Sequence, residues 1–232
     1  MIERLATATA ALAIFAGAAT ASVTYTDGTF ANSNWGLETF VAGSGGGSGS
    51  ASQSTGTGNP GDARRVTLIT GPQVGDGIYA LSRFGTTLAT RYEPSSQGAI
   101  TTLDFSIDAR FVTGTFTGAG QALYLAAKQG TTIFGAPMGV TGSSGSWTTL
   151  TATGLTPSSF VYLSGPVASF DASAAGTPIR FGFISANGNG GSPYSTTVDY
   201  DNFNLVVNAV PGPGVLACAS FGGVMSLRRK RR

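Results

Sequence analysis

Hydrophobic and polar residues alternate with a period of two along much of the chain. Leu103, Phe105 and Ile107 are separated by single polar residues, and residues 179–183 repeat the pattern. Such alternation predicts strands with one face buried. The same reasoning predicts further strands at residues 23–30, 36–41, 65–69, 78–84, 122–127, 131–134, 147–151, 160–163 and 197–207.

The segments between the predicted strands are rich in Gly, Ser and Pro, and none of them carries the apolar stripe of a helix. Many strands without helical crossovers predict an all-β fold, an antiparallel β-sandwich of the jelly-roll type, over residues 22–208. Residues 128–130 are expected to form a hairpin loop. Residues 43–59 consist mainly of Gly, Ser and Thr, so we expect a long flexible loop there.

The first 21 residues have the pattern of a signal peptide. Arg4 precedes an apolar stretch that runs to Ala18, and small residues follow up to Ala21. Signal peptidase is therefore expected to cut between Ala21 and Ser22. The alternative is an N-terminal helix buried against the domain.

The last residues combine an apolar run with a basic end. Residues 215–227 are apolar and follow a segment rich in Pro and Gly. A run of this length is short for a membrane span, but long basic side chains can extend its reach. The basic end predicts a cytoplasmic C-terminus; the alternative is a solvated tail. The five terminal basic residues are Arg228, Arg229, Lys230, Arg231 and Arg232.

Residues 210–232 resemble the PEP-CTERM sorting signal. The matching features are a Pro-x-Pro motif, a short apolar segment and an Arg-rich end, with Gly212 where the usual pattern has glutamate. The resemblance implies processing by an exosortase-type enzyme, an inner-membrane-anchored precursor, and a mature form at the cell surface or in the extracellular matrix, often with exopolysaccharide. The motif residues are Val210, Pro211, Gly212, Pro213 and Gly214.

Charge and composition exclude several classes of protein. The calculated pI of 8.8 comes from the basic tail, because residues 22–211 contain seven basic and ten acidic residues. This balance argues against nucleic acid as a partner. The chain has no histidine and a single cysteine, Cys218. Hydrolases that use a Ser/His/Asp or Cys/His arrangement are therefore excluded.

The domain itself resembles the jelly-roll domains often carried by PEP-CTERM proteins, which are similar to concanavalin-like and carbohydrate-binding modules. The matching stretches are residues 25–30 with Trp35, residues 58–62 with Arg64, and residues 181–183 with 199–203. In some such domains the first and last strands share a structural calcium ion. The resemblance implies that Asp27 and Asp201 are its candidate ligands, and a plain turn at residues 27–28 is the alternative.

Two pairs of acidic residues lie in or beside predicted strands. Asp199 and Asp201 are two residues apart in a predicted strand, which places their Cα atoms about 6.6 Å apart. That spacing overlaps the separations of glycosidase carboxylate pairs, but a solvated face or a cation site is the commoner role. Asp104 and Asp108 would be about 13 Å apart, and we expect both to be surface charges.

Aromatic side chains are the usual platforms for sugars, because sugar C–H groups stack on ring faces. A buried core position is the alternative for each of these residues. The sequence thus favours a non-catalytic cell-surface or matrix protein in adhesion or exopolysaccharide architecture. The alternatives are a lectin-like module for one glycan and, more remotely, a glycan-active enzyme using Asp199 and Asp201. The candidate glycan contacts are Trp35, Tyr92, Trp147 and Tyr194.

Overall fold

The computed structural model describes residues 21–87, 90–115 and 120–210. The expected signal peptide, apart from Ala21, and the sorting segment after Val210 lie outside the described residues. The described chain forms two antiparallel sheets of six strands each. Sheet A contains β1 (Ala21–Asp27), β3 (Gly47–Gly58), β4 (Gly61–Thr70), β6 (Ala99–Gly114), β9 (Thr148–Leu155) and β12 (Ser195–Val210).

Sheet B has the strand order β10-β8-β7-β11-β5-β2. In the described residues the helical elements are one-turn segments, α1 (Pro94–Gln97) and a 3-10 helix (Pro157–Ser159). None of the described helices has the length and apolar character needed to cross a membrane. The strands of sheet B are β2 (Trp35–Ala42), β5 (Gly77–Phe84), β7 (Ala122–Gln129), β8 (Thr132–Val140), β10 (Val161–Ser164) and β11 (Ile179–Gly188).

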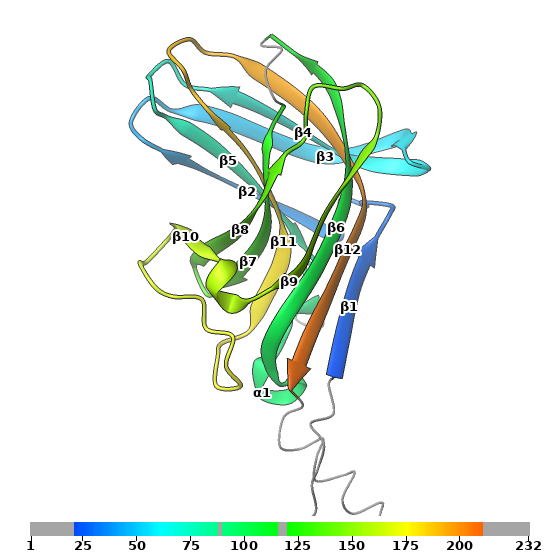
Figure 1. The fold of residues 1–232 in the computed structure, drawn as a ribbon. Coiled ribbons are helices and arrows are strands. Elements are labelled where there is room, and N and C mark those ends of the chain that lie inside the picture. Colours follow the sequence, from blue (N-terminus) through cyan, green and yellow to red (C-terminus); the bar gives the residue numbers. More distant parts are fainter. Residues whose placement is uncertain (1–20, 88–89, 116–119, 211–232) are drawn as a thin grey trace, which may run out of the picture.

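The long last strand, β12, organises sheet A. Along one edge it pairs with β6. Along the other edge its first half pairs with β4 and its second half with β1. The first and last strands of the domain therefore lie side by side, and the two ends of the described chain emerge together (Figure 1).

The main hydrophobic core lies between the two sheets. Sheet A contributes side chains such as Leu103, Phe105 and Ile107, and sheet B contributes Phe181 and Phe183. These are the residues whose alternation predicted half-buried strands. The predicted all-β antiparallel sandwich of the jelly-roll type is confirmed.

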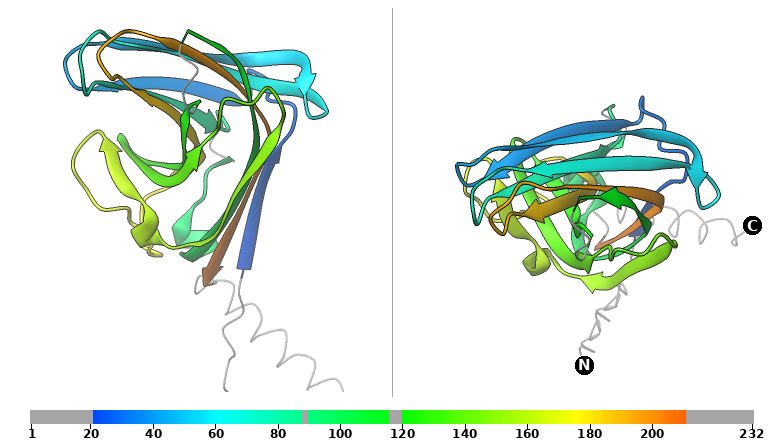
Figure 2. Two further views of the ribbon diagram at one scale, coloured as in Figure 1. Left: turned by 45° about the horizontal axis from the view of Figure 1, so that its top comes forward. Right: turned by 90° about the horizontal axis from the view of Figure 1, so that it is seen from above.

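The predicted flexible loop at residues 43–59 is wrong for most of its length, because Gly47–Gly58 forms strand β3. β3 pairs with β4 from Gly47 to Gly58, and this hairpin (cyan) extends along one side of the molecule (Figure 2). Its small residues suit a close approach: a Cβ on Gly49 would lie 3.1 Å from side-chain atoms of Leu68 and Thr39. Backbone pairing and tight packing replace the apolar side chains that the segment lacks.

The loop of the predicted hairpin at residues 128–130 begins two residues later and ends one residue later than expected. Lys128 and Gln129 belong to β7, and Gln129 pairs with Thr132 of β8. The turn is Gly130 and Thr131, and Gly130 has a φ of 58°, a left-handed conformation that glycine adopts without strain. Lys128 consequently lies on the face of sheet B, where it contributes to the site described below.

Candidate functional site

Two of the four aromatic residues that the sequence suggested as glycan contacts are buried. Trp35 is 4% exposed and contacts four phenylalanine rings with centroids 4.8 to 5.7 Å away. Tyr92 is fully buried, and its hydroxyl donates a hydrogen bond to the Gly98 carbonyl. A sugar ring has no access to either face, so both residues belong to the core.

The other two aromatic candidates are partly exposed but lie apart. The guanidinium of Arg110 lies over the Trp147 ring, 4.7 Å from its centroid. Tyr194 lines a cavity of about 530 Å³ with Gly188, and its hydroxyl donates to the carbonyl of that glycine. The structure therefore gathers none of the four candidates into a common site.

Asp27 is held in a turn. Its Oδ1 accepts hydrogen bonds from the Thr29 and Phe30 amides and the Thr29 hydroxyl, and its Oδ2 accepts one from Trp35 Nε1. Burial alone would raise the pKa of Asp27, but these bonds favour the charged form and lower it overall. Because donors already occupy both oxygens, Asp27 does not fit the expected calcium site.

Asp201 is fully buried and accepts hydrogen bonds from the Asn59 and Asn202 amides. Burial raises the pKa of Asp201, and the nearby charges of Asp108 and Asp27 add to the effect. Among the residues that the structure describes, no three Asp, Glu, His or Cys side chains form a group able to hold a metal ion. Backbone amides therefore contact both oxygens of this carboxylate.

Asp108 is not the surface charge that the sequence suggested. It is 6% exposed. Its carboxylate accepts hydrogen bonds from the Asn59 and Asn202 side-chain amides and from the Thr149 hydroxyl. It thereby joins the turn between β3 and β4 to strands β9 and β12, and its role is structural.

Asp199 is also fully buried, so the solvated face that the sequence offered as one alternative is wrong. Arg65 contacts both of its oxygens, at 2.7 and 2.9 Å, and Arg110 contacts Oδ2 at 2.9 Å. Such bidentate pairing fixes the carboxylate between β4, β12 and β6. An acid or base that works on a glycosidic bond needs access to that bond, and Asp199 has none. We do not propose catalysis by the Asp199 and Asp201 pair.

The most distinctive surface is the outer face of sheet B, which points away from sheet A. Leu123 and Leu125 of β7 belong to the core between the sheets, whereas the alternating Tyr124 and Ala126 belong to a second apolar cluster. Because side chains alternate across a strand, this second cluster lies on the opposite face. Its members are Leu81, Ala126, Ile133, Ile184 and Ala186, with Phe40, Tyr79, Ala122, Tyr124 and Leu163 packed against them.

Aromatic rings mark one part of this outer face. Phe40 and Tyr79 face each other across β2 and β5, stacked with ring centroids 4.8 Å apart and an angle of 5° between the rings. Tyr124 lies two strands away on β7. Burial raises its pKa, and Tyr79 adds to the effect, so the two phenols are electrostatic neighbours. The three rings are half-buried.

The strand register places small residues beside these rings. Gly36, Gly182, Ala126 and Gly135 occupy one row across sheet B, and Arg83 stands in that row on β5. The parallel row on one side contains Leu81, Ile184 and Tyr124. Longer side chains of neighbouring strands lie close to these small residues: a Cβ on Gly36 would lie 2.9 Å from Arg83, and a Cβ on Gly135 would lie 2.6 Å from Leu163.

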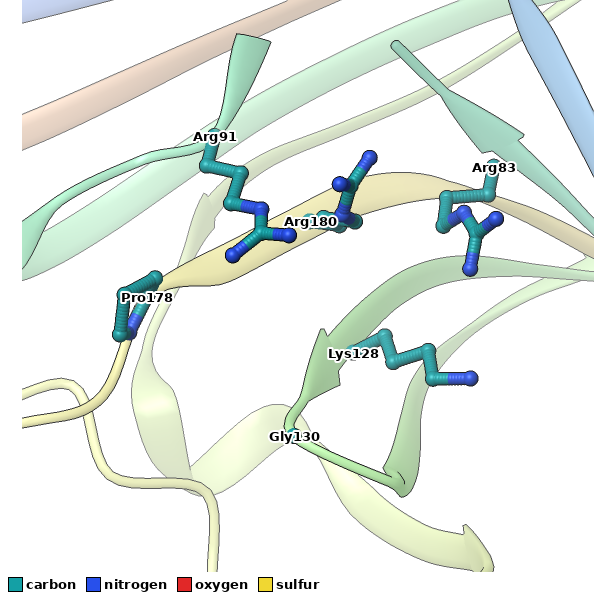
Figure 3. Close-up of a pocket in the computed structure, with 6 residues that line it drawn as sticks. All are labelled: Arg83, Arg91, Lys128, Gly130, Pro178 and Arg180. Carbon is teal, nitrogen blue, oxygen red and sulfur yellow. The ribbon is translucent and has the colours of Figure 1, made fainter. Parts of the chain in front are cut away.

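Besides Arg83 in the row itself, further cations stand on its other side. Lys128 and Arg180 pair across β7 and β11, and Arg83 and Arg91 lie beside them. Figure 3 shows Arg91, Arg180 and Arg83 in sequence across this surface, with Lys128 next to Arg83. Together with Gly130 and Pro178 they line a cavity of about 310 Å³. We call these four cations the basic cluster.

Sequence reasoning did not find this surface. In residues 78–84 and 122–127 both sets of alternating positions are largely apolar, so the pattern does not show which set faces the core. The tyrosines at 79 and 124 were a usable signal, because a phenol hydroxyl prefers a position with access to a hydrogen-bond partner or water. The basic cluster gave no usable sequence signal, because its four members are distant in sequence.

Comparison with known proteins gives structural similarities alone; no family model and no curated protein matches the chain. A family 11 carbohydrate-binding module from Clostridium thermocellum, solved with a β-1,3-1,4-mixed-linked tetrasaccharide, is 16% identical over 79% of this chain and 94% of its own, with a TM-score of 0.47. The family 11 module of a Clostridium thermocellum cellulosomal cellulase has 15% identity, coverages of 74% and 86%, and a TM-score of 0.42. TmCBM61, solved with β-1,4-galactotriose, has 7% identity, coverages of 77% and 97%, and a TM-score of 0.29. None of these similarities assigns a function.

Proposed function

We propose that this chain is a non-catalytic carbohydrate-binding protein that holds a polysaccharide on the outer face of sheet B. The observation that carries the proposal is that half-buried rings, small residues and long polar side chains share that one face. Sugars need both kinds of group, because their C–H faces stack on apolar rings while their hydroxyls require hydrogen bonds.

The size of the face suits a chain of sugars. Six strands spaced by about 4.8 Å span about 24 Å, so a ligand that crosses the strands can contact Phe40 and Tyr79 at one side and Leu163 at the other. Because the rings are held by packing within the second apolar cluster, little side-chain freedom is lost on binding. This preorganisation favours a binding role.

Binding to soluble polysaccharides in affinity electrophoresis tests the proposal. We expect retardation of the wild-type domain by at least one member of a panel that includes mixed-linkage β-glucan, galactan and polygalacturonate. Tyr79→Ala and Tyr124→Ala should each weaken that binding about tenfold, the loss expected for a central aromatic contact. Thermal unfolding monitored by circular dichroism shows whether each variant is folded.

Trp147→Ala is the matched control, because it removes a partly exposed ring from outside this face. We expect it to keep the wild-type affinity within about twofold, as contacts outside a binding site contribute little. Unchanged affinity in both tyrosine variants would place the ligand elsewhere. An equal loss in Trp147→Ala would overturn the proposed site.

We further propose that the protein acts outside the cytoplasm, at the cell surface or in the matrix, in adhesion or exopolysaccharide architecture. Support comes from the signal-peptide pattern of residues 1–21 and from the Pro-x-Pro motif, apolar run and basic end of residues 210–232. Signal peptidase and an exosortase-type enzyme are the processing partners in this proposal, and membrane attachment precedes processing.

A further inference from the structure

The domain concentrates its available positive charge in one place. Residues 22–211 contain seven basic side chains. Arg65 and Arg110 are paired with Asp199, and Arg64 is buried at 1% exposure. The other four form the basic cluster, although they come from positions 83, 91, 128 and 180. Residues 22–211 contain more acidic than basic side chains. Every basic side chain among them that is neither buried nor paired with Asp199 nevertheless lies around one cavity.

Protein carboxylates neutralise little of this cluster. In the described parts of the chain, Glu38 alone forms ion pairs with it, at 2.5 Å to Lys128 Nζ and 3.8 Å to Arg83. Arg180 donates to the Gly85 carbonyl. Arg91 has no carboxylate within ion-pair distance among these residues. Four cations therefore face a single carboxylate.

Two buried nitrogens of the cluster also lack acceptors. Nε of Arg83 and Nε of Arg91 are buried and form no hydrogen bond within the described structure. Buried donors in proteins are nearly always paired, so an unpaired one calls for an explanation. Burial lowers the pKa of Arg180, and repulsion from Arg91 and Arg83 lowers it further. An anion in the cavity would supply acceptors and relieve this repulsion.

We infer that the polysaccharide bound by this chain is acidic, and that the basic cluster binds its carboxylate or sulfate groups. The inference rests on the proposed glycan binding. Guanidinium groups suit such ligands because their planar N–H donors match two oxygens of one anionic group. The strand register supports the geometry: Lys128 and Arg180 lie on one side of the row of small residues and Tyr124 lies on the other. Tyr124 and Lys128 are four residues apart on β7, about 13 Å, so neighbouring sugars of one chain would contact the ring and the cavity together.

The test compares probes that differ in charge. Binding of the full domain is measured by isothermal titration calorimetry with polygalacturonate, dextran sulfate, dextran and mixed-linkage β-glucan. We expect saturable binding to an acidic probe that weakens at least tenfold between low and high salt, because salt screens contacts between charges. Comparison of polygalacturonate with dextran sulfate identifies whether carboxylate or sulfate is preferred, and inorganic phosphate alone should compete weakly.

The variants address the cluster directly. Arg91→Gln/Arg180→Gln removes two cations that have no carboxylate partner, and we expect it to reduce acidic-probe affinity about tenfold or more. Arg91→Gln alone removes no hydrogen bond between described residues, so it reports on charge even if the double variant unfolds. Thr151→Glu/Thr153→Glu on β9 changes net charge equally at exposed positions of sheet A and should leave affinity within about twofold.

The outcomes separate this inference from the proposed function. Binding to a neutral probe that is lost in Tyr124→Ala but unchanged in the arginine variants would refute the acidic ligand and keep the proposed function. An equal loss in the β9 control would also refute it, since the effect would then be one of net charge. If no probe binds and the tyrosine variants match the wild type, the proposed function fails as well.

Discussion

At the residue scale, side chains with the same sequence signal have different roles because their neighbours differ. Trp35 and Trp147 both appear as candidate platforms in the sequence. Trp35 is enclosed by phenylalanine rings and its indole donates to Asp27, whereas Trp147 lies near the surface against Arg110. The decisive difference is which strands pack against each ring, and no pattern local to the residue records that.

Asp27→Asn should destabilise the domain in a pH-dependent way. The charged carboxylate accepts bonds from two backbone amides and from Trp35 Nε1, and its folded-state pKa is lowered. Its contribution is therefore present above the unfolded-state pKa of about 4 and is lost as pH falls through the folded-state value. We expect a loss of about 1–2 kcal/mol in the free energy of unfolding at pH 7, shrinking below about pH 4.

Urea unfolding at several pH values measures this effect. Glu93→Gln is the control, because it removes a negative charge whose carboxylate accepts no hydrogen bond from the residues that the structure describes. It should leave stability within about 0.5 kcal/mol. If Asp27→Asn lowers the free energy of unfolding as much at pH 3 as at pH 7, the shape of the side chain and not its charge is responsible.

At the scale of elements, β3 shows how composition misleads. Gly, Ser and Thr are typical of linkers, yet the backbone of Gly47–Gly58 pairs with β4 along its length. What the segment contributes is small size: Gly49 packs near Leu68, Thr39 and Ala80. The apolar surface it covers belongs to other strands, so its own sequence shows no hydrophobic alternation.

Neighbouring substitutions in β3 should therefore have opposite consequences. Gly49→Val places side-chain atoms against Leu68 and Thr39, and we expect a loss of about 1–3 kcal/mol from overpacking. Ser50→Val, one residue along and exposed, should be neutral or slightly stabilising, because β-branched residues favour strands. Denaturant unfolding of both variants gives the comparison. If both substitutions change the free energy of unfolding equally, residues 47–58 form a loop and not a packed strand.

At the scale of the whole molecule, the adjacent first and last strands place both ends of the domain at one pole. The described chain thus begins and ends on the same side of the domain. A polypeptide anchored at either end would present the remainder of the sandwich away from its anchor, which suits a surface role.

Intact mass and peptide mapping of protein recovered from its native envelope test the proposed processing. We expect a mature chain that begins at Ser22 and ends near residues 211–213, because these are the boundaries of the signal-peptide and Pro-x-Pro patterns. A soluble cytoplasmic chain that retains Met1 and Arg232 would refute both the export and the sorting proposals.

The sequence by itself determined the all-β class, most strand positions and the absence of histidine chemistry. Hydrophobic alternation is local, and it directly reflects burial of one face, as at Leu103, Phe105 and Ile107. The same reasoning failed for β3, whose pairing depends on a partner strand, and for Asp108 and Asp199, whose burial depends on neighbours from several strands.

Only the tertiary structure decided where the candidate site lies. The strand order brings Arg83, Lys128 and Arg180 together and aligns Tyr124 with Ile184 and Leu81. These relations depend on the register and on which face of each strand meets sheet A. Where both faces of a strand are apolar, the local sequence does not show which face will meet sheet A. That is decided by how the two complete sheets pack to bury the most apolar surface.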